Sequence, residues 1–103
     1  MDTDTAARCL AELGQPTRLA VYRLLVEAGP EGLPVGAIGR TLEVAPSTLS
    51  HHLSHLVWSG LVAQRRQGRS LRCTARYQTM EALIDFLRKD CCRAETAPAA
   101  ADG

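Results

Sequence analysis

The sequence predicts a mainly α-helical domain with one small β-hairpin, which is an α+β fold. Gly and Pro divide the chain into short segments, and in most of these the apolar residues recur at the three-to-four spacing of a helix. Between residues 61 and 76 the apolar residues instead alternate, as they do in a strand. The chain has 103 residues, of which 46% are hydrophobic and 22% charged, so it has the size and composition of one globular domain.

The helical segments begin and end at these breaks. In chain order we predict a short helix that stops at Gly14, a second from Pro16 to Ala28, a third with Pro34 in its first turn, a fourth that opens at Pro46 and closes at Ser59-Gly60, and a last one with Met80, Leu83, Ile84, Leu87 and Cys91 on one stripe. The fourth is the clearest, because its apolar residues share one face: Leu49, Leu53, Leu56 and Val57.

Residues 61–66 and 70–76 are predicted to pair as two strands joined at Gln67-Gly68-Arg69. Along the second strand apolar residues alternate with polar and basic ones, so that one face contacts the core and the other is cationic. The hairpin and the helices together make a domain of residues 1–93. We expect residues 94–103, which are rich in Ala and Pro, to be a disordered tail.

Neither a membrane-spanning segment nor a signal peptide is predicted. No window approaches the ~18 consecutive apolar residues of a spanning helix, and the first residues, MDTDTAARCL, have no basic start and no apolar run. We therefore expect a cytoplasmic protein without a membrane partner. Because a core drawn from about a hundred residues is modest, we also expect a dimer that buries further apolar surface.

The net charge of +1 conceals an uneven distribution along the chain. No Asp or Glu lies between Glu43 and Glu81, yet this stretch holds all three histidines and the arginines Arg65, Arg66, Arg69, Arg72 and Arg76. A cationic middle with acidic ends favours a polyanion bound at one face. The alternative is a strand of arginines that is merely solvated.

The order of the elements favours DNA as the polyanion. Two helices joined by a short turn can present the second to the major groove, and a basic hairpin can reach the flanking phosphates. The fourth helix has short hydroxyls and imidazoles opposite its leucines, and these can contact base edges. The candidate DNA-contacting residues are Ser47, Thr48, Ser50, His51 and Ser54 on this helix, whose exposed face also carries His55 and Trp58, and Arg65, Arg66 and Arg69 in the hairpin.

The stretch from Leu13 to Cys92 resembles the ArsR/SmtB family of winged-helix repressors. "LGQPTRLAVYRLL" is similar to the family's second-helix entry, "APSTLSHHLSHLVWSGLV" to its recognition helix and "RRQGRSLRCTA" to its wing. The resemblance implies a winged helix-turn-helix repressor, homodimeric through its first and last helices, with double-stranded operator DNA as partner. It places Ser47, Ser50 and His51 at DNA-contacting positions and gives His52 a structural role. Such a dimer would bind an inverted repeat.

Four cysteines suggest what the protein senses: Cys9, Cys73, Cys91 and Cys92. Stable disulfides are not expected in the reducing cytoplasm. Cys73 falls on the apolar face of a strand, which favours a buried structural thiol. Cys91 and Cys92 are adjacent, so both can reach one ion only where the helix frays. Thiolates select soft ions.

The string "RKDCC" is similar to an arrangement in which ArsR-type repressors bind trivalent arsenic or antimony through a vicinal pair at the end of the last helix. The resemblance implies an effector site at Cys91 and Cys92. The third thiol often found downstream is missing here, and Cys9 of either chain is the candidate replacement. Two thiolates suffice for a mono-organic arsenical, whereas inorganic arsenite needs a third. The alternatives are a thiol-redox or persulfide switch and a pair that simply caps the apolar stripe.

Other classes are less well supported. His51 and His55 are four residues apart, as in zinc-binding helices, but no further ligand is adjacent, so structural zinc is not expected. The last helix offers Glu81 and Asp85 without a His, which disfavours a zinc sensor. No organic cofactor is expected. An enzyme such as a thiol reductase is disfavoured because a phosphate-cradling loop and a C-x-x-C are both missing. A protein-interaction module of the same fold remains an alternative.

Overall fold

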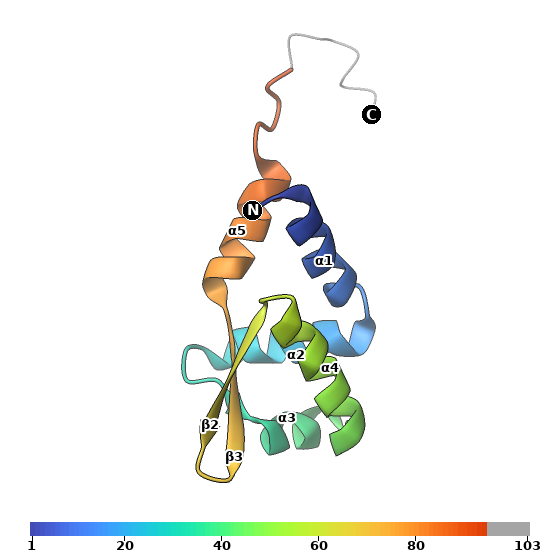
Figure 1. The fold of residues 1–103 in the computed structure, drawn as a ribbon, viewed down its shortest axis with the longest axis vertical. Coiled ribbons are helices and arrows are strands. Elements are labelled where there is room, and N and C mark those ends of the chain that lie inside the picture. The colour runs from blue at the N-terminus through green and yellow to red at the C-terminus, as the bar shows by residue number, and fades with distance from the viewer. Residues whose placement is uncertain (95–103) are drawn as a thin grey trace.

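A computed structural model describes residues 1–94. The elements follow in the order α1 (Thr3–Leu13), α2 (Pro16–Ala28), β1 (Leu33–Pro34), α3 (Val35–Leu42), α4 (Pro46–Trp58), β2 (Val62–Gln67), β3 (Ser70–Ala75) and α5 (Tyr77–Arg88). Helices α1 and α5 lie together at one end, and the β2–β3 hairpin and α3 lie at the other (Figure 1). The α+β class and the predicted succession of helices and hairpin are confirmed. Of the predicted tail, residues 94–103, only residue 94 is among the described residues.

The sheet has a third strand that the sequence did not reveal. Its order is β1-β3-β2, and both pairings are antiparallel. Leu33 pairs with Cys73 and Pro34 with Arg72. A two-residue strand has no alternation to detect. Pro34 has extended backbone and is the N-cap of α3, so the helix begins one residue later than predicted.

The hairpin turn is also one residue shorter than predicted. Gln67 pairs with Ser70, so the turn contains only Gly68 and Arg69. Gly68 has φ +60, a left-handed conformation that favours glycine at this position of a tight hairpin. The shorter turn places Arg69 at the tip, and we call the β2–β3 hairpin the wing.

Local sequence explains where the helices begin. Asp2 caps α1 by accepting a hydrogen bond from the Thr5 backbone N–H at 2.8 Å, and Gln15 caps α2 by accepting one from Arg18 at 2.7 Å. Pro16 and Pro46 occupy the first turns of α2 and α4, where a missing N–H costs nothing. The helices enclose a core whose largest fully buried side chains are Leu25, Ile38, Leu49, Leu53, Leu56 and Leu61.

The last helix is shorter than its predicted apolar stripe. It ends at Arg88, and a turn follows in which Asp90 and Cys92 have positive φ. Cys91 was predicted to continue the stripe of α5, but it lies beyond the helix, as does Cys92. Among residues 1–94, no helix is long and apolar enough to cross a membrane.

Candidate nucleic-acid interface

Helix α4 separates a buried face from an exposed polar face. Its buried residues are Leu49, His52, Leu53 and Leu56, and this burial gives His52 the structural position expected of it. The five candidate residues of α4 are all exposed: Ser47, Thr48, Ser50, His51 and Ser54. The Ser54 hydroxyl donates to the Ser50 carbonyl at 3.0 Å, which leaves its oxygen able to accept a further hydrogen bond.

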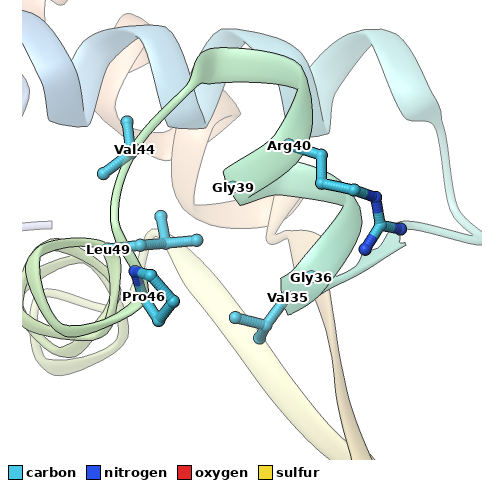
Figure 2. A pocket seen from close by; sticks show the side chains of 7 residues that line it. All are labelled: Val35, Gly36, Gly39, Arg40, Val44, Pro46 and Leu49. Atoms are coloured by element: carbon cyan, nitrogen blue, oxygen red, sulfur yellow. The ribbon is translucent and has the colours of Figure 1, made fainter.

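A tight turn and apolar side chains between α3 and α4 hold the two helices together. The chain turns at Glu43, which has left-handed φ +55, and the Val44 N–H donates to the Gly39 carbonyl at 3.0 Å. A Cβ at Gly39 would lie only 3.2 Å from the Val44 oxygen, so glycine permits this close approach. A hollow of about 290 Å³ lies between the helices. Figure 2 shows side chains that line it, with Val44, Pro46 and Leu49 on the α4 side and Val35 on the α3 side.

The wing carries three exposed arginines: Arg65, Arg66 and Arg69. Arg65 lies opposite Arg72 in the register, whereas Arg66 lies opposite Leu71. Successive side chains on a strand point to opposite faces, so Arg65 and Arg66 project from different faces of the wing. A polyanion could therefore contact the wing from either side.

Arg72 makes hydrogen bonds within the protein that its place in the basic stretch of sequence does not reveal. Its Nε donates to Gln67 Oε1 at 2.7 Å, and its Nη1 donates to the backbone oxygens of Glu31 at 3.0 Å and Gly32 at 3.3 Å. These bonds tie β3 to the loop before β1. Arg72 is thus committed to the protein's own backbone, unlike its neighbours in the wing.

The wing arginines have no acidic partner within residues 1–94. The ion pairs in this range join Arg18 and His55 to Glu12, Arg23 to Glu27, Arg88 to Asp85 and Arg93 to Asp90. The three exposed arginines of the wing, Arg65, Arg66 and Arg69, therefore remain available to an external anion, as the acid-free stretch of sequence predicted.

A buried carboxylate connects three helices near the C-terminal end of α4. Glu12 of α1 accepts a hydrogen bond from Arg18 of α2, and its Oε2 accepts another from Nδ1 of His55 at 3.0 Å. His55 is only partly exposed, although its spacing placed it on the open face of α4. The sequence carries a signal for this buried acid. Glu12 follows Ala6 and Cys9 at intervals of three residues, so it lies on the same buried face of α1.

The structure separates the four cysteines into two kinds. Cys9 and Cys73 are fully buried, and burial raises the pKa of both thiols. The Cys9 thiol donates to the Ser59 carbonyl at 3.5 Å. Cys91 and Cys92 are exposed, with their Sγ atoms 3.4 Å apart. Cys9 does not join this pair, and no group of three His, Cys, Asp or Glu residues in the described range is placed to hold a metal ion.

Apolar side chains remain exposed at the end of the molecule formed by α1 and α5. Leu10 of α1 and Ile84 and Leu87 of α5 are exposed, and the two helices contact each other. A second exposed group lies on α4, where Val57 and Trp58 end the helix and the Arg8 guanidinium is 4.5 Å from the centre of the Trp58 ring.

Known proteins share this arrangement. Residues 13–65 match the helix-turn-helix domain family. An uncharacterized helix-turn-helix transcriptional regulator of Methanocaldococcus jannaschii is 37% identical over 65 residues, which are 63% of this chain and 71% of the relative. The homodimeric winged helix-turn-helix DNA-binding domain of a Mycobacterium bovis protein is 26% identical with a TM-score of 0.67, over 84% of this chain and 81% of that one.

A further solved structure supports the fold alone. An ArsR-like transcriptional regulator from Rhodococcus sp. RHA1 is 23% identical with a TM-score of 0.77, over 95% of this chain and 90% of that one. These likenesses agree with the exposed face of α4 and with wing arginines that have no acidic partner in residues 1–94. The chain therefore belongs to the helix-turn-helix domain family and is a DNA-binding transcriptional regulator with the winged helix-turn-helix fold of ArsR-type proteins.

Proposed function

We propose that the protein is a homodimeric repressor whose two α4 helices enter successive major grooves of an inverted-repeat operator. We further propose that trivalent arsenic or antimony bound at Cys91 and Cys92 releases it from DNA. The observation that carries the DNA-binding part is the exposed polar face of α4 in the same domain as a wing whose arginines have no acidic partner in residues 1–94.

In this proposal α4 contacts the bases and the wing contacts the phosphates. A slim helix with short polar side chains fits a major groove ~12 Å wide, and its hydroxyls and imidazoles can donate to or accept from base edges. The guanidinium groups of the wing attract phosphate without regard to sequence. The base-reading residues would be Ser47, Thr48, Ser50, His51 and Ser54, and the phosphate-contacting residues Arg65, Arg66 and Arg69.

The dimer interface would be the exposed apolar surface of α1 and α5, which includes Leu10, Ile84 and Leu87. The Mycobacterium bovis domain of similar fold is homodimeric, which supports this assignment. A two-fold axis through these helices sets the distance between the two α4 helices, and half-sites about one helical turn apart would match it.

The effector site would use the two exposed thiols beyond α5. Sulfur atoms 3.4 Å apart can bind one soft ion together as thiolates. A mono-organic trivalent arsenical needs no more, whereas inorganic arsenite takes a third sulfur, for which Cys9 of either chain is the candidate. Because Cys9 is buried against Ser59, its recruitment would shift α1 and hence the dimer interface. An effector that favours a mismatched spacing of the α4 helices lowers DNA affinity by linkage.

Fluorescence anisotropy with the protein's own upstream DNA tests the proposal. We expect specific binding that arsenite, methylarsenite or antimonite reverses. Cys91→Ser and Cys92→Ser should bind DNA normally and fail to release it, whereas Cys73→Ala, the control, should release normally because this thiol lies in the core. Release of both serine variants at wild-type effector concentrations would refute the effector site without affecting the DNA-binding proposal.

A second candidate switch is thiol oxidation, which the exposed Sγ contact between Cys91 and Cys92 also favours. A hydroperoxide would take two electrons from the two thiols, forming one S–S bond while the peroxide is reduced to water and an alcohol or a second water. Mass spectrometry separates the two switches. An arsenical adds the mass of arsenic, whereas oxidation removes two hydrogen atoms.

A further inference from the structure

We propose that Glu12 is a positioning residue for DNA reading: its buried carboxylate, on the α1 helix, holds the C-terminal half of α4 in place through His55. The inference rests on the proposed DNA contact by α4, because it states what orients that helix. It assigns a role in DNA binding to a side chain that faces the protein interior.

The carboxylate of Glu12 is shared between two helices. Glu12 is 8% exposed, and its two oxygens have separate partners. Oε1 accepts from the Arg18 guanidinium of α2, and Oε2 accepts from Nδ1 of His55 on α4 at 3.0 Å. A buried carboxylate is stable only when it is paired and hydrogen-bonded, so these partners are required by the burial itself. One side chain of α1 thereby fixes α4 relative to α2.

The connection continues from His55 to the exposed face of α4. The rings of His55 and His51 meet edge to face, with centroids 4.6 Å apart. His51 is exposed and is one of the proposed base-reading residues. A hydrogen bond that fixes the His55 ring therefore also limits the positions that the His51 ring can take. The path runs from Arg18 through Glu12 and His55 to His51.

Apolar packing alone does not hold the side of α4 that faces α1. A hollow of about 330 Å³ lies beside the helix, lined by Glu12, Ser54, His55 and Trp58. The indole is the one large apolar group among these four side chains, and Trp58 is itself 65% exposed. The contacts between α1 and this end of α4 include the Glu12 hydrogen bond and the Arg8 guanidinium over the indole. Polar contacts thus take a role that apolar packing performs on the opposite face of α4.

The groups that contact His55 come from α1 and α4, and a third helix, α2, shares the Glu12 carboxylate. The His55 ring contacts Glu12 of α1 and His51 of α4, and Arg18 of α2 pairs with the same carboxylate. Arg18 already balances the charge of Glu12, and a neutral imidazole can donate through its Nδ1–H. The contact is thus a hydrogen bond to a carboxylate that already has an ion-pair partner.

A double-mutant cycle measured by DNA anisotropy tests the proposal. We expect Glu12→Gln and His55→Gln each to raise the Kd for operator DNA by about tenfold, as loss of a hydrogen bond to a charged group predicts. The double variant should be no weaker than the weaker single variant, because both changes break the same contact. The slope of log K against log salt should stay unchanged, since every phosphate contact is kept. The control is Glu27→Gln, an exposed acid of α2, which should bind like wild type.

Three results would overturn the proposal. Additive effects in the double variant would mean that the two residues act separately. A shallower salt slope in His55→Gln would mean that His55 contacts phosphate itself. Wild-type affinity in His55→Gln would mean that the contact does not orient α4, and this variant keeps the Arg18–Glu12 pair, so it decides the matter should Glu12→Gln fail to fold.

Amide hydrogen exchange separates this proposal from the proposed function. Faster exchange along the second half of α4 in His55→Gln, with little change in α2, supports the positioning role even for a protein that binds no operator. Unchanged exchange along α4 would refute the positioning role while leaving DNA binding by the wild type intact.

Discussion

Arg65 and Arg72 lie directly opposite each other on the two strands of the wing. Like charges at opposed positions destabilise a strand pair unless something offsets them. Arg72 is held by backbone oxygens and Gln67, whereas Arg65 is exposed and has no acidic partner within residues 1–94. The wing is therefore better suited to a neighbouring phosphate backbone than to free solution.

This difference between the two arginines predicts different effects on DNA binding. Replacing Arg65 or Arg69 with Ala should weaken binding to specific and non-specific DNA alike, and should reduce the slope of log K against log salt by about 0.9 for each phosphate that the variant no longer neutralises. Arg72→Ala should instead lower the melting temperature, because it removes the bonds to Glu31, Gly32 and Gln67. Anisotropy titrations at several salt concentrations and thermal melts measure the two effects.

The control for the wing is Arg23→Ala, which removes an exposed arginine of α2 paired with Glu27. Its salt slope should equal that of wild type. An unchanged slope in the double variant Arg65→Ala/Arg69→Ala would show that the wing does not contact phosphate, and would favour a fold that serves protein interaction.

Gly32, in the loop before β1, is predicted to be the least replaceable glycine within residues 1–94. It has φ +66, and a Cβ there would overlap the Cys73 carbonyl oxygen and lie 2.5 Å from Cγ2 of Thr74. Gly32→Ala should lower the free energy of unfolding by about 2 to 4 kcal/mol, because strain and a backbone displacement add together. Gly29→Ala is the matched control, since Gly29 has φ +80 with nothing within 4 Å of its Cβ position. It should cost about 1 kcal/mol. If urea denaturation showed the same loss of unfolding free energy in both variants, this prediction would be wrong.

The contrast between α4 and β1 shows which features could be predicted. The bounds of α4 follow from Pro46 and from Ser59-Gly60, local signals that need no knowledge of the fold. Strand β1 exists only because the wing lies beside Leu33 and Pro34, and no local pattern marks it. The hydrogen bond between Glu12 and His55 joins residues 43 positions apart, so periodicity could place each on a helix face without showing that they meet. The apolar stripe of α5 predicts a helix as far as Cys91, but the helix ends at Arg88, three residues earlier.

The apolar surface of α1 and α5 predicts a dimer that one charge can break. Leu87 is 59% exposed on α5, and Leu87→Glu should raise the dimer dissociation constant by about thirtyfold or more, since a carboxylate would be buried without a partner. Leu19→Glu is the control, because Leu19 is an apolar residue of α2, 43% exposed, outside the proposed interface. Sedimentation equilibrium measures both variants. Dissociation by Leu19→Glu with an intact Leu87→Glu dimer would move the interface to α2.

His52 predicts that the fold loses stability in mild acid. Burial lowers its pKa from the ordinary value of about 6.5, and Arg18, His51 and His55 lower it further. The unfolded chain then binds a proton more readily than the folded protein, so the contribution of His52 is complete above about pH 6.5 and is lost as the pH falls toward the folded pKa. Thermal melts between about pH 5 and pH 8 should show this decline, and His52→Leu should flatten it. His51→Gln, at an exposed position, should keep it. An equally steep decline in His52→Leu would assign the acid sensitivity to other groups.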